Sequence, residues 1–245
     1  MVTSLEAIKK LKVKYSMAIK GIEKFSLLDY DDKVSCVIFL SNCNMRCPFC
    51  HNAPLVLDPN FGENIPFEDV LSYLEKRKGL VDAVVVTGGE PTLTPDLYDM
   101  VKKIKDLGYL VKLDTNGTNP AILKKLVEDK LVDYVAMDIK NSLAKYPLTS
   151  GVNLNLDKIK ESIAYLIQGN VDYEFRTTVI NGYHTLEDMK EIAQLLKGAK
   201  KYRIQKFNDR ETCIKQGLSE IPKEEAEEFI KVLKNDIDDV ALRGY

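Results

Sequence analysis

Short apolar segments alternate along the chain with longer segments in which apolar residues recur every three or four positions. The short segments are rich in Val, Ile, Tyr and Phe, which is typical of strands with both faces buried in a parallel sheet. The longer segments have the period of amphipathic helices. We predict strands at residues 34–40, 83–87, 110–114, 134–139, 173–180 and 202–207.

Capping residues mark the predicted helices between these strands. Residues 94–96 (Thr-Pro-Asp) and 119–120 (Asn-Pro) are typical of an N-cap followed by a proline in the first helical turn. Thr185 opens another helix, and further helices are predicted at residues 156–168 and 223–234. Glycines follow several of these segments, as they do at helix ends.

This order predicts consecutive βα units wound in a right-handed α/β fold. Because eight units are needed to close a full barrel, six units favour a partial (β/α)6 barrel with parallel strands. We assign residues 21–245 to this barrel. Residues 1–20 are predicted to form an N-terminal extension, helical and outside the core.

Length and charge narrow the possible functions. The 245 residues suffice for one α/β barrel domain, and the net charge of −2 argues against a basic nucleic-acid-binding protein. Apolar runs such as residues 37–40 are too short to span a membrane. The lysine-containing N-terminus lacks the apolar segment and cleavage site of a secretory signal. We therefore expect a cytoplasmic protein without nucleic-acid or membrane partners.

Three of the five cysteines follow the first predicted strand directly. Cys43, Cys47 and Cys50 would lie at its carboxyl end, where α/β folds place their sites. Without an export signal, a disulfide framework is not expected. Cys213 is expected to be a free thiol on the same face of the sheet, and no role is predicted for Cys36.

The cysteine loop has four possible interpretations. Three thiolates at this spacing can hold a cubane iron–sulfur cluster and leave one iron without a protein ligand. Structural zinc would need His51 or Cys36 as a fourth ligand, but His51 directly follows Cys50, which is poor tetrahedral geometry. A redox pair of Cys47 and Cys50 leaves Cys43 unexplained, and the haem-attachment pattern of residues 47–51 belongs to exported chains. The cluster is favoured, and the others stay open.

A second motif, Gly88-Gly89-Glu90, ends the second predicted strand. Glycines there let a ligand approach the backbone closely, and the carbonyls and Glu90 could bind an ammonium group. Alone, the motif is also compatible with an ordinary turn. Its position at the same edge of the sheet as the cysteine loop makes it more informative.

Together these motifs resemble those of the radical S-adenosylmethionine (SAM) superfamily. The spacing of the three cysteines, with Phe49 before the third, matches its cluster motif, and residues 88–90 match its methionine-binding turn. The stretch from residues 21–26 through residues 50–52 resembles more narrowly the activating proteins of anaerobic ribonucleoside-triphosphate reductases, which are related to pyruvate formate-lyase activating enzymes. The resemblance covers residues 18–235, although residues 30–32 lack a proline expected in that turn.

The resemblance implies two cofactors and a radical reaction. A [4Fe-4S] cluster with one open iron would be held by Cys43, Cys47 and Cys50, the catalytic centre, and would bind and reductively cleave SAM to a 5′-deoxyadenosyl radical. Phe49 would pack beside the adenine. Gly88, Gly89 and Glu90 would meet the methionine ammonium group.

The resemblance and the positions at later strand ends suggest further SAM contacts. Thr115 and Asn116 could contact ribose or methionine, and Lys140 could neutralise the SAM carboxylate. Arg176 is expected to point to a carboxylate, either that of SAM or Glu90, and His184 could supply a polar SAM contact. A monovalent cation is conceivable near Asp114 and Asp138. The alternative is an ordinary turn for Thr115 and Asn116 and a solvated side chain for Lys140. For Arg176 it is a structural ion pair, and for His184 a capping or surface position.

The resemblance thus implies an activating enzyme that forms a glycyl radical on a partner, with anaerobic ribonucleotide reductase as the expected partner. A flavodoxin- or ferredoxin-type protein would donate the electron. One alternative is a radical SAM enzyme for a small molecule, similar to deazaguanine synthases. The other is a non-catalytic zinc or thiol-redox module.

Overall fold

The computed structural model describes residues 18–58 and 60–245. Its strands form one eight-stranded sheet in which each strand pairs with its neighbours along the chain. The first pair is antiparallel and all the other pairs are parallel. The strands are β1 (Ile19–Ser26), β2 (Ser35–Leu40), β3 (Ala83–Gly88), β4 (Leu110–Thr115), β5 (Tyr134–Asp138), β6 (Asp172–Val179), β7 (Lys201–Lys206) and β8 (Asp239–Arg243).

The six predicted strands are confirmed as β2 to β7, within one residue at each end. The partial barrel is also confirmed, but it has eight strands rather than six, because β1 and β8 extend the sheet at its two edges. Part of the predicted N-terminal extension belongs to the core: Ile19 is fully buried and pairs with Leu40 of β2. The rest of that extension, residues 1–17, lies outside the described residues.

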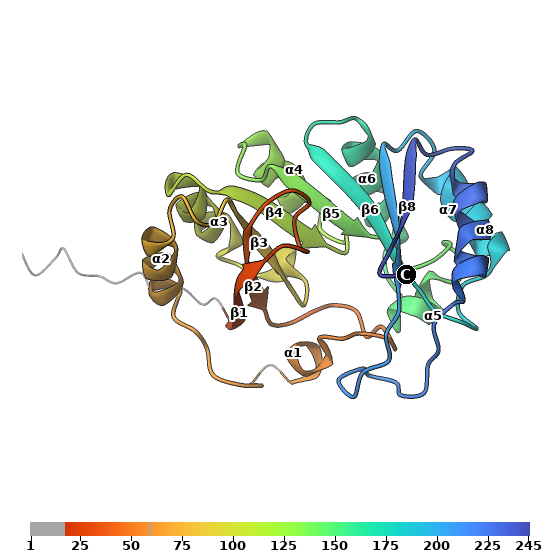
Figure 1. Cartoon of the computed structure of the whole chain (residues 1–245), viewed down its shortest axis with the longest axis horizontal. Helices are drawn as coiled ribbons and strands as arrows, with labels where there is room; N and C mark the ends of the chain where they lie inside the picture. The colour runs from red at the N-terminus through yellow and green to blue at the C-terminus, as the bar shows by residue number, and fades with distance from the viewer. Residues whose placement is uncertain (1–17, 59) are drawn as a thin grey trace, which may run out of the picture.

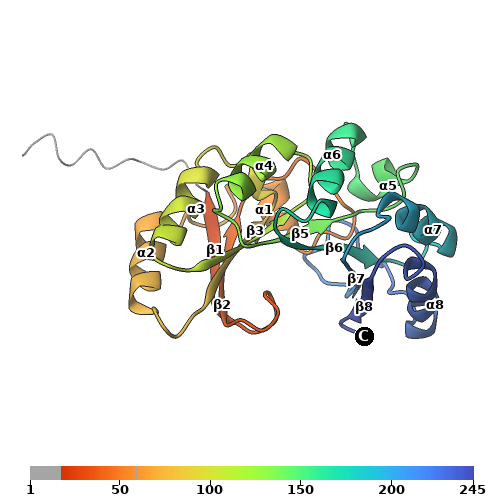
Figure 2. The same cartoon turned by 90° about the horizontal axis from the view of Figure 1, so that it is seen from above.

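Helices cover the outer side of the curved sheet. Figures 1 and 2 show α2, α3, α4, α6, α7 and α8 arranged around it, with the opposite side left open. None of the helices in the described part of the chain is long and apolar enough to cross a membrane. The helices are α1 (Ala53–Leu57), α2 (Phe67–Lys76), α3 (Leu97–Asp106), α4 (Pro120–Glu128), α5 (Tyr146–Ser150), α6 (Leu156–Ile167), α7 (Leu186–Leu195) and α8 (Lys223–Leu233).

The capping residues place most helix starts correctly. Asn119 precedes α4, and Thr185 caps α7 in a capping box with Asp188. The start after Thr94 is wrong: residues 94–96 form a turn, and α3 begins at Leu97 with Asp96 as its N-cap. A short 3-10 helix, Pro91–Leu93, precedes this turn.

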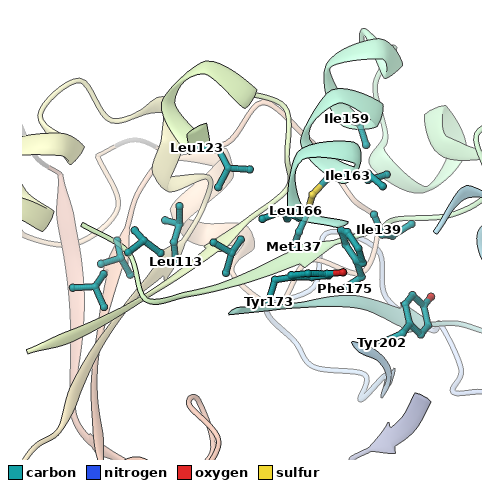
Figure 3. Packing of buried hydrophobic residues seen from close by; sticks show 14 of the residues in the cluster. Leu113, Leu123, Met137, Ile139, Ile159, Ile163, Leu166, Tyr173, Phe175 and Tyr202 are labelled. Carbon is teal, nitrogen blue, oxygen red and sulfur yellow. The ribbon is translucent and has the colours of Figure 1, made fainter. Parts of the chain in front are cut away.

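Alternation along the strands gives the sheet two cores. Side chains on the outer face, such as Leu113 and Met137, pack against α4 and α6 through Leu123, Ile163 and Leu166 (Figure 3). A smaller inner cluster is closed by the turn between β1 and β2, and contains Tyr30, Val37, Ala83, Val85, Tyr134 and Ala136. The rest of the barrel interior is polar, and this space holds the candidate site.

Arg243 connects the two edges of the sheet. From β8, its guanidinium donates two hydrogen bonds to the buried Glu174 of β6, at 2.9 and 3.0 Å, and contacts Asp31 of the β1–β2 turn at 3.3 Å. Side-chain contacts therefore link the edges, although β1 and β8 do not pair. The barrel stays open on the side away from the helices.

Candidate active site

The interior of the barrel contains a cavity of about 430 Å³. It is surrounded by the carboxyl ends of the central strands and by the loop that follows β2, which carries the three clustered cysteines. Eleven of the twelve predicted site residues line this cavity, and His184 does not. The eleven are Cys43, Cys47, Phe49, Cys50, Gly88, Gly89, Glu90, Thr115, Asn116, Lys140 and Arg176.

Backbone contacts fix the shape of the cysteine loop. The Arg46 amide donates to the Ser150 carbonyl at 2.7 Å, and the Cys50 amide donates to the Cys47 carbonyl at 3.0 Å. The Arg46 guanidinium turns back and donates to the Cys43 and Met45 carbonyls, both at 2.7 Å. The loop is therefore held in one conformation by contacts that do not involve its thiols.

All three thiols are available for a metal. The five cysteines are free, and burial raises the pKa of Cys43 and of Cys47 to about 11 and raises that of Cys50. Metal ligation requires the thiolate, so a bound metal would displace these protons. The three thiols share one cavity, as ligands of a common group must.

The contacts of His51 bear on the zinc interpretation, in which it is a possible fourth ligand. Residues 18–58 and 60–245 contain no group of three or more Cys, His, Asp or Glu side chains that could hold a metal ion as they stand. His51 instead pairs its Nε2 with the Asn208 carbonyl at 2.8 Å and stacks on Phe207.

The Gly88-Gly89 turn packs directly on the cysteine loop. Gly88 pairs in register with Leu40, and a Cβ on Gly89 would lie 1.9 Å from the Asn42 carbonyl oxygen. The Gly89 amide donates to the Leu40 carbonyl at 2.8 Å, and the Glu90 amide donates to the Asn42 carbonyl at 2.7 Å. The two sequence motifs therefore form one backbone unit, which tolerates no side chain at these glycines.

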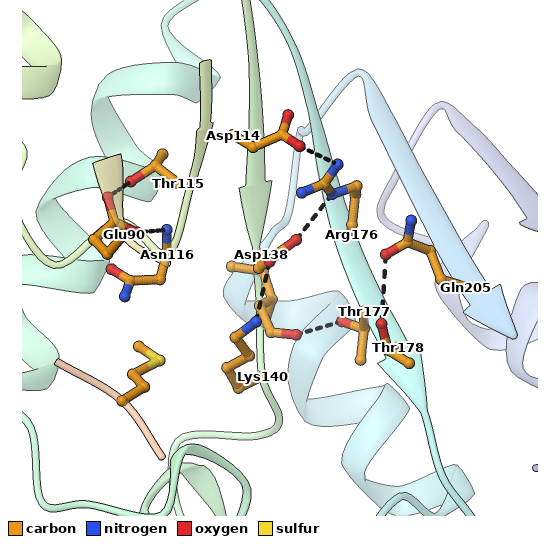
Figure 4. A network of polar contacts seen from close by, with 12 residues as sticks. Glu90, Asp114, Thr115, Asn116, Asp138, Lys140, Arg176, Thr177, Thr178 and Gln205 are labelled. Atoms are coloured by element: carbon orange, nitrogen blue, oxygen red, sulfur yellow. Dashed lines mark hydrogen bonds and ion pairs between the residues drawn. The ribbon is translucent and has the colours of Figure 1, made fainter. Parts of the chain in front are cut away.

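Glu90 is a buried carboxylate surrounded by hydrogen-bond donors. It is 1% exposed and accepts bonds from the Thr92 amide and hydroxyl, the Thr115 hydroxyl and the Asn116 amide, at 2.6 to 3.1 Å. Figure 4 shows the contacts with Thr115 and Asn116. Burial raises its pKa although these donors oppose the shift. No salt bridge to Glu90 is present among the described residues. A carboxylate in this position suits a ligand that brings its own positive charge, such as an ammonium group.

We expect the Glu90→Gln substitution to destabilise the protein. Every group that contacts the Glu90 side chain is a donor, and the amide nitrogen of glutamine would add a further donor against them. The free energy of unfolding should fall by about 1–3 kcal/mol, as measured by urea denaturation. The exposed Glu220→Gln substitution is the matched control, and equal stability of the two variants would contradict this account.

Polar side chains after β4 connect Glu90 to the cysteine loop. The Asn116 side chain donates to the Asn44 side chain at 2.9 Å, and that of Asn44 donates to the Thr118 hydroxyl at 2.9 Å. Thr115 and Asn116 therefore already have protein partners. Both still line the cavity, and their contact with SAM stays a prediction.

A chain of alternating charges crosses the cavity floor (Figure 4). The Arg176 guanidinium donates to Asp138, its register partner on β5, at 2.8 Å and to Asp114 at 3.2 Å. Lys140 donates to the other oxygen of Asp138 at 3.0 Å. Burial raises the pKa of Asp138, but Arg176 and Lys140 outweigh this effect and hold it at about 2. For Lys140, burial opposes the charged form, but Asp138 outweighs it and raises the pKa.

These contacts correct the expectation that Arg176 pairs with Glu90. Glu90 is saturated by neutral donors, whereas Arg176 lies between the two strand-end aspartates. The guanidinium supplies positive charge where we predicted a monovalent cation. The Oδ1 atom of Asp114 is buried without a hydrogen bond, with the Lys112 ammonium 3.8 Å away. A cation there, and contact of Lys140 with the SAM carboxylate, stay predictions.

His184 holds two backbone segments together and does not reach the cavity. Its Nδ1 accepts from the Ile180 amide at 3.1 Å, and its Nε2 donates to the Lys140 carbonyl at 2.9 Å. Burial lowers its pKa, which favours this neutral tautomer. With both ring nitrogens used, the predicted polar contact with SAM has no free atom to make it. His184 instead supports the backbone of Lys140 and packs edge-on to Phe49.

Sequence reasoning missed several residues that shape the site. The Asn52 side chain donates to the Gly88 carbonyl at 2.8 Å and links the end of the cysteine loop to the glycine turn. Gly151 has a φ of +72°, and a Cβ added to this residue would lie 2.1 Å from the Arg46 carbonyl oxygen. Asn52 lies next to His51 and could have been considered. Gly151 gives no local signal, because its contact is made across the fold.

Comparisons with known proteins agree with this geometry. Residues 37–196 match the radical SAM superfamily. A protein of Methanocaldococcus jannaschii with the provisional name of a glycyl-radical enzyme activating enzyme is 36% identical, over 92% of this chain and 95% of its own. The pyruvate formate-lyase-activating enzyme of Clostridium pasteurianum is 31% identical, over 50% of this chain and 52% of its own. The crystal structure of Streptococcus suis SuiB has a TM-score of 0.65, over 83% of this chain and 47% of that one, at 14% identity, a similarity of fold alone.

Proposed function

The chain belongs to the radical SAM superfamily, and from this we propose that it is an activating enzyme that forms a glycyl radical on a partner protein. The observation that carries the proposal is one cavity that contains three free thiols, the closely packed glycine turn and a buried carboxylate that has no salt bridge within residues 18–58 and 60–245. The similarity to a provisionally named activating enzyme along nearly the whole of both chains supports the specific reaction.

Each group in the cavity has a proposed role. Cys43, Cys47 and Cys50 would hold a [4Fe-4S] cluster, which with bound SAM supplies a 5′-deoxyadenosyl radical on reduction. Glu90 and the carbonyls of the glycine turn would bind the methionine ammonium group. Phe49 would pack beside the adenine, and Lys140 would orient the methionine carboxylate. The walls of the barrel would shield the reacting atoms from water and oxygen on all sides but the open one, which the bound partner would cover.

The proposal also names a partner protein and an electron donor. An anaerobic ribonucleoside-triphosphate reductase is the proposed partner, and a flavodoxin- or ferredoxin-type protein in the cytoplasm is the proposed electron donor. Both rest on the sequence resemblance of the stretch from residues 21–26 through residues 50–52. The open side of the barrel is consistent with a polypeptide substrate, because no described segment closes it (Figure 2).

The first test is SAM cleavage. The protein is loaded anaerobically with iron and sulfide and incubated with SAM, with and without dithionite. We expect 5′-deoxyadenosine only in the reduced sample. If the protein incorporates its cluster but forms no 5′-deoxyadenosine, the proposed radical SAM reaction is wrong. Zinc binding or thiol redox chemistry would then be favoured.

The second test is radical transfer. The reduced enzyme is incubated with SAM and the anaerobic reductase, and electron paramagnetic resonance is used to detect a glycyl radical on the reductase. A signal that requires all three components supports the proposal. Cleavage of SAM without such a signal on any glycyl-radical enzyme of the same organism would favour the small-molecule alternative.

A further inference from the structure

The end of β1 and the turn that follows it expose three large apolar side chains within four residues. Phe25 is 57% exposed, Leu27 is 62% exposed and Leu28 is 86% exposed. Single exposed apolar residues are common on protein surfaces, but a contiguous group often marks a binding site. We call residues 25–32 the β1–β2 tip.

The tip is rigidly held, so the exposure of its leucines is not a consequence of loose structure. Tyr30 is buried against Tyr134, with ring centroids 5.4 Å apart. The Lys112 ammonium donates to the Asp29 carbonyl. The Ser26 hydroxyl donates to the Asp29 carboxylate and accepts from the Leu28 amide at 3.2 Å. These contacts fix the backbone on both sides of Leu27 and Leu28.

The tip also adjoins the reaction cavity. Asp29, the residue after the two leucines, lines the same cavity as the three cysteines. Figure 2 shows this turn on the open side of the curved sheet, opposite α3, α4 and α6. The register of β1 and β2 puts the tip at the amino end of β2 and the cysteine loop at its carboxyl end, so a partner that covers the open side would span both.

We propose that the β1–β2 tip is a docking element for the protein partner whose glycine enters the cavity, an inference that rests on the proposed function. The chemistry of the tip describes the surface that it fits. Leu27 and Leu28 would insert into an apolar depression on the partner. Asp32 is exposed beside them, so a basic side chain should border that depression, whereas Asp31 already contacts Arg243.

A polypeptide fits these observations better than a small molecule does. A small substrate is held by cavity-lining groups, and exposed leucines outside the cavity would add nothing to its binding. A folded partner gains affinity from apolar anchors, and the gain is larger when the anchors need no ordering on binding. The fixed backbone of the tip meets that condition.

The test compares two variants of the loaded enzyme. In Leu27→Ser/Leu28→Ser the apolar anchors are removed. In the control, Leu80→Ser, a leucine with 63% exposure is replaced in the turn between α2 and β3. The probe is the glycyl-radical enzyme that the wild type activates. We expect the double variant to raise KM for that enzyme about 10- to 100-fold, to leave kcat nearly unchanged and to cleave SAM normally without partner.

Several outcomes decide the inference. Wild-type KM in the double variant, or an equal rise in Leu80→Ser, would overturn it. Recovery of KM in Leu27→Met/Leu28→Met would support an apolar contact, and unchanged thermal unfolding of the double variant would exclude a folding defect as the cause. If the wild type cleaves SAM but forms no glycyl radical on any candidate, the proposed function fails first and the docking role fails with it.

Discussion

Replacing Gly89 with alanine is expected to lower the rate of 5′-deoxyadenosine formation about 100-fold. The new Cβ would lie 1.9 Å from the Asn42 carbonyl oxygen and 2.6 Å from its carbon. Neither atom can move independently, because the same carbonyl accepts the Glu90 amide and the Asn42 amide donates to Leu55. The glycine turn and the cysteine loop must separate, and a displacement of about 1 Å in a catalytic arrangement can cost about 100-fold in rate.

The matched control is Gly21→Ala in β1. There the nearest atoms to a new Cβ belong to the Phe39 side chain at 3.5 Å, an ordinary contact, so activity and stability should be retained. Iron content and 5′-deoxyadenosine are measured for both variants. Normal turnover in Gly89→Ala would show that the close packing of the two motifs is not required for SAM cleavage.

Arg176→Met is expected to give the largest loss of stability, about 3 kcal/mol. Arg176 is the shared partner of Asp114 and Asp138, and its removal leaves two largely enclosed carboxylates with less compensation. Lys140 still pairs with Asp138, and Lys112 lies 3.8 Å from Asp114, so we expect the lower end of the range for broken buried pairs. Urea denaturation at neutral pH measures the loss.

Arg203→Met provides a control one strand away. Arg203 is the register partner of Arg176 on β7, but it pairs with Asp239, which is 54% exposed. Such a pair contributes about 1 kcal/mol or less. Equal destabilisation of the two variants would show that the loss comes from shortening an arginine in the sheet and not from the charges around the cavity.

The same variant should change the response to acid. The pKa of Asp138 in the folded protein, about 2, lies below its ordinary value of 3.8. Its ionised form therefore stabilises the fold above pH 3.8, and this stabilisation is lost as the pH falls toward 2. Without Arg176 the pKa of Asp138 should rise toward its ordinary value, so less of this stabilisation is present at neutral pH and less is lost in acid. The difference in the free energy of unfolding between the wild type and Arg176→Met should therefore shrink as the pH falls from 3.8 toward 2. Urea unfolding curves between about pH 2 and pH 5 test this, and a difference that stays constant or grows in acid would contradict it.

The central strands could be predicted from the sequence because each is buried on both faces. Residues 83–87 and 134–139 are almost entirely apolar, and no other element fits so short a run. The edge strands lack this signal. β1 (IKGIEKFS) contains a glycine and three charges, and β8 (DVALR) has five residues, of which one is fully buried. Their pairing depends on neighbours that the sequence pattern does not reveal.

Those parts of the candidate site whose residues are contiguous in the sequence could be predicted. The cysteine loop and Gly88-Gly89-Glu90 are contiguous, and their adjacency follows from consecutive parallel strands. The partners of Arg176 and His184 could not be predicted, because they depend on side-chain geometry across strands and on which backbone groups lack a partner. A buried arginine indicated a carboxylate, but Asp114, Asp138 and Glu90 were all compatible with the pattern.

The pairing of Glu174 with Arg243 has a consequence for how the sheet assembles. Glu174 is fully buried in β6, yet its bidentate partner lies two strands later and 69 residues further along the chain. A sheet that has formed only through β7 would hold this carboxylate with the Lys112 ammonium 3.9 Å away as its nearest compensation. Folding intermediates without β8 are therefore disfavoured, and the last strand makes the completion of the barrel cooperative although every strand pairs with its neighbours in sequence.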